Sequence, residues 1–93
     1  MEFIKNDDGK RGIMFAVDHQ NEIGAMTYTW AGDDKIIIDH TEVNEKYNGQ
    51  GIGKKILEHI IDWAREDKVK IIPLCPFAKA QFDKNDSFKD VLF

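Results

Sequence analysis

Three glycines at alternating positions, Gly49, Gly51 and Gly53, stand directly before a segment with helical hydrophobic spacing. That spacing predicts one helix from roughly Gly51 to Glu66. Glycines at a helix start allow a concave turn in which free N–H groups and the helix dipole point at one place. The stretch therefore predicts an anion-binding turn. The apolar residues that define the helical spacing are Ile52, Ile56, Ile60 and Trp63.

Spacing excludes two familiar nucleotide-binding motifs. A P-loop requires Gly-Lys followed by Ser or Thr, whereas Lys54 is followed by Lys55. The dinucleotide fingerprint requires a third glycine three residues after the second, and Gly51 and Gly53 are only two apart. A turn that merely caps the helix for packing remains an open alternative.

The chain before the glycines predicts three strands. The stretch 11–30 alternates apolar and polar residues around a polar break at 19–21, which is typical of a hairpin. A turn at 31–34 leads to a third strand, Lys35 to Val43. This strand is apolar on both faces at its start and polar at its end, as expected for a central strand that brings polar groups to one edge of the core.

The chain after the main helix predicts shorter elements. A short strand at Val69 to Ile72 is stopped by Pro73, which cannot donate to a sheet ladder. Pro76 to Lys84 suits a short helix, and Ser87 to Phe93 suits either a last strand or a docked tail. At 93 residues, we expect one α+β domain covering 1–93.

Composition narrows the class of protein. The net charge of -4 argues against nucleic-acid binding, which normally needs a basic face, and slightly favours basic or neutral substrates. A single cysteine, an N-terminus without a signal-peptide core and the lack of a spanning apolar run favour the cytoplasm, with no membrane association. Because His19, His40 and His59 are dispersed and Cys75 has no cysteine partner, we expect no metal site.

The segment "VNEKYNGQGIGKKIL" resembles the acetyl-CoA-binding segment of the GNAT superfamily of N-acetyltransferases. The pattern of that family is Arg or Gln, two residues, Gly, one residue, then Gly or Ala. Asn48, Gly51 and Gly53 occupy these places, and Asn48 departs from the pattern by losing the long polar side chain. The flanking "IDHTEV" and "AREDKVKIIPLCPFA" resemble a subgroup of small stand-alone GNAT domains with HTEV and CPF motifs. That subgroup lacks the helices that shape the acceptor site in larger relatives.

The resemblance implies a compact, mixed, mostly antiparallel sheet with a splayed parallel strand pair, one main helix after the glycine loop and a short C-terminal helix. Acetyl-CoA would lie where the strand ending at Val43 and the strand Val69 to Ile72 separate. Its pyrophosphate would meet the backbone amides of 50–54, and its pantetheine arm would pair with the main chain near Val43. The cofactor-binding residues expected on this basis are Val43, Asn48, Gly49, Gln50, Gly51, Ile52, Gly53, Lys54 and Lys55.

An amine acceptor must lose a proton before it attacks a thioester, because an amine with a pKa of about 10.4 is mostly charged at pH 7. Alternation along the third strand predicts that His40 and Glu42 share a face with Ile36 and Ile38. Glu42 resembles the strand carboxylate that some GNAT enzymes use as general base, directly or through water. His40 has a suitable ordinary pKa for the same role. A strand-end ion pair or a hydrogen-bonded core histidine is the open alternative.

Cys75 is the third candidate for catalysis. Many GNAT enzymes place a tyrosine in this region to protonate the departing thiolate, but the nearby aromatic residue here is Phe77, which cannot donate a proton. Cys75 could supply that proton or carry the acetyl group as a nucleophile. The alternative is a small buried hydrophobic residue.

These observations favour an acetyl-CoA-dependent N-acetyltransferase that acts by direct transfer to an amine, on a small molecule or on a protein or peptide. A CoA- or acyl-CoA-binding module without efficient catalysis remains an alternative from a different class. A small interaction domain without a ligand remains open if the glycine turn is only a cap.

Overall fold

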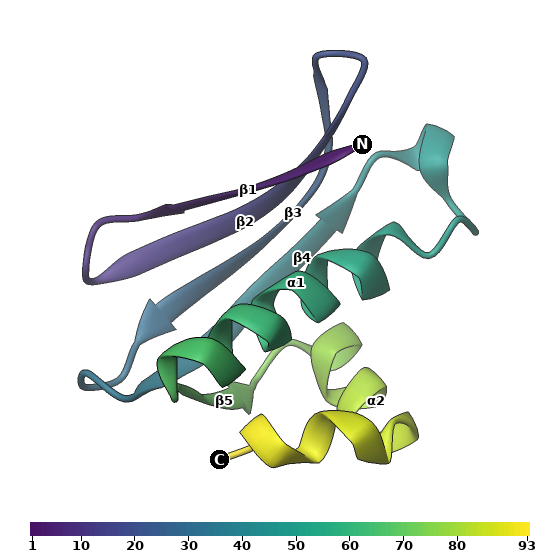
Figure 1. The fold of residues 1–93 in the computed structure, drawn as a ribbon. Helices are drawn as coiled ribbons and strands as arrows, with labels where there is room; N and C mark the ends of the chain where they lie inside the picture. Colours follow the sequence, from purple (N-terminus) through teal and green to yellow (C-terminus); the bar gives the residue numbers. More distant parts are fainter.

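The computed structural model describes residues 1–93, in which five strands form one sheet in sequential order (Figure 1). The first four strands pair antiparallel, and β4 pairs parallel with β5. The strands are β1 (Glu2–Asp7), β2 (Arg11–Asp18), β3 (Asn21–Trp30), β4 (Lys35–Val43) and β5 (Lys70–Pro73). No helix interrupts the first four strands, which agrees with the architecture expected for a small GNAT-like domain.

Two α-helices and two short 3-10 helices complete the fold. The helices are α1 (Ile52–Asp67), α2 (Pro76–Lys84), η1 (Glu45–Tyr47) and η2 (Asp86–Val91). The structure confirms the predicted helix after the glycines and the predicted short helix from Pro76 to Lys84. None of these helices combines the length and the apolar character that crossing a membrane requires.

The hairpin between β2 and β3 is also confirmed, with a two-residue turn at His19 and Gln20. Both residues have left-handed backbone angles, with φ of 50° and 67°. This is the conformation that tight hairpin turns use, because its twist matches that of the flanking strands.

Strand β1 was not predicted. It lies at the edge of the sheet and pairs only with β2, and four of its six residues are exposed. A strand of this kind has no regular burial pattern, because neither of its faces packs continuously against the core.

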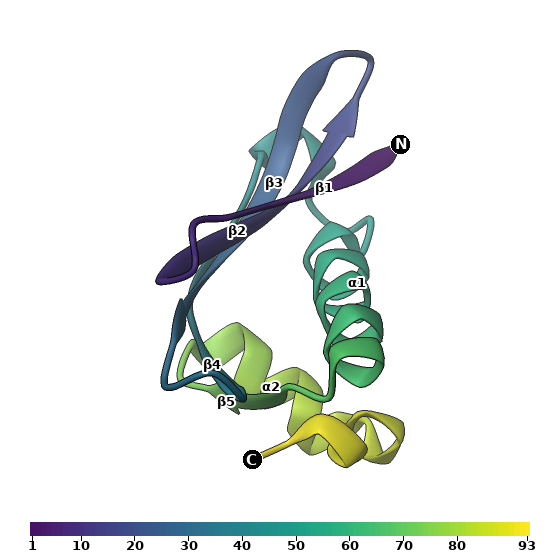
Figure 2. The same cartoon turned by 60° about the vertical axis from the view of Figure 1, so that its left-hand side comes forward.

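Helix α1 packs along one side of the sheet, and α2 and η2 gather at the β5 end (Figure 2). The main core is one cluster of 20 buried residues contributed by the sheet, both α-helices and η2. From α1 it receives the apolar face predicted by helical spacing, except that Trp63 is only partly buried.

The parallel strand pair separates after four residues. Pairing runs from Lys35 with Lys70 to Ile38 with Pro73, so β5 lies one residue later than the predicted Val69 to Ile72. Strand β4 continues to Val43 without a partner on this side, while the chain after β5 turns into α2. The Cys75 amide donates to the Ile38 carbonyl (3.0 Å) at the point of separation.

The C-terminal segment is a docked tail rather than a strand. It forms η2 and then a single bridge from Leu92 to Ile71. The Phe93 amide donates to the Ile71 carbonyl (2.9 Å), which holds the tail beside β5.

Candidate functional site

A cleft of about 490 Å³ lies between the end of β4, the glycine turn and α2. Its walls are formed by Thr41, Val43, Tyr47, Asn48, Gly49, Gly51, Ile52, Gly53, Lys54, Phe77 and Gln81. Seven of the nine residues expected to bind the cofactor are therefore in one place. Gln50 and Lys55 are next to the cleft in sequence but do not line it.

Gly49 and Gly51 give the turn its shape. Their φ angles are 79° and 71°, in the left-handed region that side chains rarely adopt. A Cβ at either position would meet no atom within 4 Å, so the space above the turn is open. Gly51 is also the residue that precedes α1, and no side chain caps the helix there.

The start of α1 leaves four backbone donors free. The first backbone hydrogen bond of the helix runs from the Lys55 amide to the Gly51 carbonyl (3.0 Å). The amides of 51–54 have no acceptor in the chain. The Gln50 amide is used, because it donates to the Tyr47 carbonyl (3.3 Å). Four free N–H groups at the positive end of a 16-residue helix form a site suited to a phosphate group.

Gly53 has a different role from the other two glycines. It is buried and helical, and a Cβ there would lie 2.8 Å from the Phe77 ring of α2. The missing side chain leaves room for the Phe77 ring beside α1.

The opposite wall of the cleft is the part of β4 that extends beyond β5. Thr41 and Val43 line the cleft there, and both are partly buried. The backbone edge of β4 past Ile38 has no strand partner on this side. An extended chain can pair with such an edge as an added strand does.

A bulge changes the expected faces of β4. His40 pairs with Thr27 and Ile38 pairs with Tyr28, so Asp39 has no partner residue in β3. The Thr29 hydroxyl donates to the Asp39 carboxylate (2.6 Å), which holds the extra residue on the outer face of the sheet. One inserted residue reverses the alternation for the rest of the strand.

The predicted sharing of one face by Ile36, Ile38, His40 and Glu42 is therefore wrong. The two isoleucines are fully buried, whereas the side chains of His40 and Glu42 are 65% and 78% exposed on the outer face. The prediction that His40 and Glu42 project together is confirmed, because Nε2 and Oε1 lie 3.1 Å apart.

Cys75 is buried, with 5% exposure, and does not line the cleft. Its Sγ atom and the Thr41 Oγ1 atom share a hydrogen bond of 3.2 Å, which joins β4 to the residue that precedes α2. Thr41 both lines the cleft and shares this hydrogen bond with the thiol.

Four of the residues that line the cleft were not predicted from the sequence to bind the cofactor. These residues are Thr41, Tyr47, Phe77 and Gln81. Thr41 faces the cleft only because the bulge moves it there, and the α2 residues depend on how that helix packs.

The Tyr47 hydroxyl donates to Asp18 (3.1 Å), and this hydrogen bond raises the pKa of the tyrosine. Tyr47 thereby ties the turn to the end of β2.

No group of three or more His, Cys, Asp or Glu side chains is arranged to hold a metal ion.

A parallel strand pair that separates beside a helix start with free amides is the arrangement that the GNAT resemblance implies, and a solved GCN5-like structure shares this fold. The chain belongs to the GCN5-related N-acetyltransferase family, whose model matches residues 13–91.

Individual relatives agree with this assignment. The solution structure of a GCN5-like protein from Staphylococcus aureus is 35% identical, with a TM-score of 0.77, and the match covers 99% of this chain and 87% of that one. NATD1 from Danio rerio is 24% identical over 72 residues, which are 77% of this chain and 66% of that protein. An aminoglycoside 6'-N-acetyltransferase complexed with coenzyme A shares the fold, with a TM-score of 0.61 at 15% identity over 69% of this chain and 37% of that one.

Proposed function

We propose that this protein transfers the acetyl group of acetyl-CoA directly to an amine, on a small molecule or on a protein or peptide. The observation that carries the proposal is the set of four free amides, Gly51 to Lys54, at one end of a cleft whose opposite wall is an unpaired strand edge. A pyrophosphate and an extended pantetheine arm need these two features side by side.

In the proposed complex the pyrophosphate accepts hydrogen bonds from the free amides of the turn. Lys54 lines the cleft and adds a positive charge there, and Lys55 adds a second charge from outside it. The pantetheine arm runs along β4 beside Thr41 and Val43. A fold neighbour that was solved with coenzyme A supports this choice of cosubstrate.

The proposed chemistry is a single displacement. The neutral amine attacks the thioester carbonyl, a C–N bond forms and the C–S bond breaks. The amine proton passes to Glu42 or His40, directly or through water, and the CoA thiolate takes a proton from solvent or from a hydroxyl or thiol nearby. The His40 and Glu42 pair faces outward, so the acceptor approaches from the outer face of the sheet.

Direct transfer is favoured over an acetylated enzyme because the Cys75 thiol is buried and does not line the cleft. A nucleophilic thiol needs access to the acetyl carbon and a group that deprotonates it. The only polar side chain bonded to Cys75 is the Thr41 hydroxyl, which is not a base.

Acetyl-CoA titration of two matched glycine variants tests the binding site. Gly51→Val and Gly9→Val place the same side chain at left-handed backbone positions where nothing lies within 4 Å, so both carry similar strain. We expect Gly51→Val to weaken acetyl-CoA binding by at least about ten-fold and Gly9→Val to leave it within about two-fold, because only Gly51 lies under the phosphates. Equal affinities for the two variants in calorimetry would remove the proposal.

Thiol release with a panel of amines separates an enzyme from a module that only binds CoA. Glu42→Gln or His40→Ala should lower the turnover rate by about one hundred-fold for the residue that acts as base, while acetyl-CoA affinity stays unchanged. If the wild-type protein binds acetyl-CoA tightly but releases no CoA thiol with any amine, the result would favour a module that only binds CoA. An acetyl group on Cys75 that passes to an added amine at the turnover rate would overturn direct transfer.

A further inference from the structure

A second hollow of about 670 Å³ lies at the other end of the sheet from the cleft. We call it the tryptophan cavity, and its chemically active lining is Lys5, Asp7, Trp30, Asp33, Trp63 and Asp67. Trp30 ends β3 opposite Ile36, near the start of β4, whereas the cleft lies at the end of β4. Val43 lies seven positions after Ile36 along β4, so the two sites are roughly 20 Å apart. The proposed acetyl transfer uses none of these six residues.

Two indole rings form the aromatic part of the cavity. The centroids of Trp30 and Trp63 lie 5.7 Å apart with the rings nearly perpendicular (86°). The N–H group of each ring donates to a carboxylate, Trp63 to Asp67 (2.7 Å) and Trp30 to Asp7 (3.0 Å). A carboxylate on the indole N–H increases electron density in the ring, which strengthens the attraction of a cation to the ring face.

The charge around the rings is negative. Desolvation raises the pKa of Asp7, but hydrogen bonds from Tyr28, Gly9 and Trp30 outweigh it and hold the pKa below its usual value. Asp7 is therefore ionised at neutral pH. Asp33 makes no hydrogen bond or ion pair with the chain, so its carboxylate is available to a ligand.

Lys5 shows which group the cavity accepts. Its ammonium nitrogen lies 4.0 Å from the centroid of a Trp63 ring. Lys5 takes part in none of the ion pairs of the chain, so this ammonium is held by the indole and by the field of the carboxylates rather than by one partner. Lys5 lies on the exposed edge strand β1, and its flexible stem can swing away without disturbing the core.

We infer that the tryptophan cavity binds a primary alkylammonium group from outside the chain, as carried by polyamines and by lysine side chains, and that Lys5 is its internal competitor. The rings supply the cation–π face, and Asp33 and Asp67 supply charge and hydrogen-bond acceptors at the rim. This site is separate from the acceptor site, so it does not depend on the proposed function.

The test uses the intrinsic fluorescence of the protein. The chain has two tryptophans and both line the cavity, so the signal reports on this site. Butylammonium should change the tryptophan fluorescence and the two indole N–H signals in NMR spectra in a saturable manner. The control is 1-butanol, which has a similar chain without the charge and should cause no such change. Lys5→Met keeps the stem but removes the competing ammonium, and we expect it to tighten butylammonium binding by about three-fold.

Charge variants complete the test. Asp33→Asn with Asp67→Asn should weaken butylammonium binding by at least about three-fold, whereas Asp83→Asn, an exposed carboxylate on α2, should leave it unchanged. Spermidine that binds more tightly than a lysine tripeptide identifies a polyamine as the ligand, and the reverse order identifies a protein side chain. Equal responses to 1-butanol and butylammonium, or no saturable response in Lys5→Met, would overturn the inference.

Discussion

Gly53 of α1 faces the Phe77 ring of α2 beside the cleft. A Cβ at this position would lie 2.8 Å from the Phe77 ring, closer than real side chains come, although the backbone itself is helical and tolerates any residue. The contact is therefore a matter of space between α1 and α2 rather than of backbone strain.

We predict that Gly53→Ala destabilises the protein by about 1–2 kcal/mol, because the methyl group overpacks against Phe77 and this cost exceeds the gain in helix propensity. Acetyl-CoA affinity should fall in the same variant. Adding Phe77→Leu should restore stability and binding together, as measured by urea unfolding and calorimetry of both single variants and the double variant. Additive effects in this cycle would show that the two residues do not share one contact.

Asp7 is the acceptor for three neighbouring groups. The Tyr28 hydroxyl (2.6 Å), the Trp30 indole (3.0 Å) and the Gly9 amide (2.7 Å) all donate to its carboxylate. Desolvation raises the pKa of Asp7, but these hydrogen bonds outweigh it and hold the pKa below its ordinary value in the folded protein. A group with a lowered folded pKa stabilises the fold above its unfolded pKa and loses this contribution as the pH falls through the folded pKa.

We therefore predict that Asp7→Asn lowers the free energy of unfolding by about 1 kcal/mol at pH 7, allowing for partial solvent screening. The difference from wild type should be constant from pH 7 to about 5 and should shrink below the unfolded pKa of about 3.9. Denaturant unfolding at a series of pH values measures it. A difference that instead grows in acid would contradict the lowered pKa.

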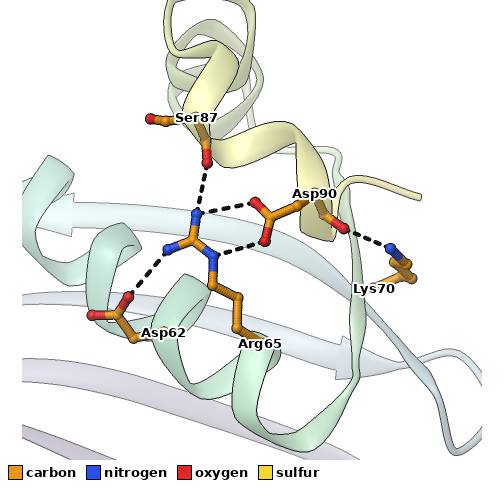
Figure 3. Close-up of polar contacts among 5 residues, drawn as sticks. All are labelled: Asp62, Arg65, Lys70, Ser87 and Asp90. Atoms are coloured by element: carbon orange, nitrogen blue, oxygen red, sulfur yellow. Dashed lines mark hydrogen bonds and ion pairs between the residues drawn. The ribbon is translucent and has the colours of Figure 1, made fainter.

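Among the elements, η2 is hydrogen-bonded to α1 through one arginine, Arg65 (Figure 3). Arg65 of α1 donates to both oxygens of Asp90 (2.8 and 3.0 Å) and to the Ser87 carbonyl (2.6 Å). Lys70 of β5 donates to the Asp90 carbonyl (2.6 Å). A planar guanidinium can make such a two-pronged contact, whereas a lysine in its place cannot.

We predict that Arg65→Lys and Arg65→Met both loosen η2, with faster hydrogen exchange of the Phe88 and Leu92 amides, while acetyl-CoA affinity stays unchanged because the cleft is formed elsewhere. Lys79→Met is the matched control, since it removes an exposed ion pair with Asp83 on α2. Protection of these amides in Arg65→Lys as strong as in wild type would show that charge alone holds the tail.

Taken as a whole, the molecule has one main core. The 20 buried residues of that cluster come from the sheet, the helices and the tail. An element would therefore lose its apolar contacts if the other elements unfolded. A domain of this kind should unfold in one cooperative step.

Ile60 lies on α1 and is fully buried. We predict that Ile60→Ala costs about 2–5 kcal/mol, because it removes buried methyl groups and leaves a cavity. Tryptophan fluorescence and far-ultraviolet circular dichroism should still give coincident unfolding curves. Separate transitions for the two probes would indicate that the sheet and the helices unfold independently.

Local patterns were enough to predict α1, β4, the hairpin and the glycine turn. Each of these features depends on neighbours within a few residues. They are the helical spacing of Ile52, Ile56 and Ile60, the alternation in Arg11–Trp30, and the backbone freedom of Gly49 and Gly51. The residues expected to bind the cofactor came instead from the resemblance to the GNAT acetyl-CoA segment, and seven of the nine line the cleft.

The bulge at Asp39, the edge strand β1 and the tryptophan cavity could not be predicted in this way. The bulge and the cavity depend on contacts between segments that are distant in the sequence, Thr27 with His40 and Trp30 with Trp63, whereas β1 lacks a regular burial pattern because it lies at the edge of the sheet. A one-residue change in such a pairing turns every later side chain to the other face of the sheet. Local periodicity therefore identified Glu42 and His40 as neighbours, but only the folded sheet placed them on the outer face, away from α1 and the core.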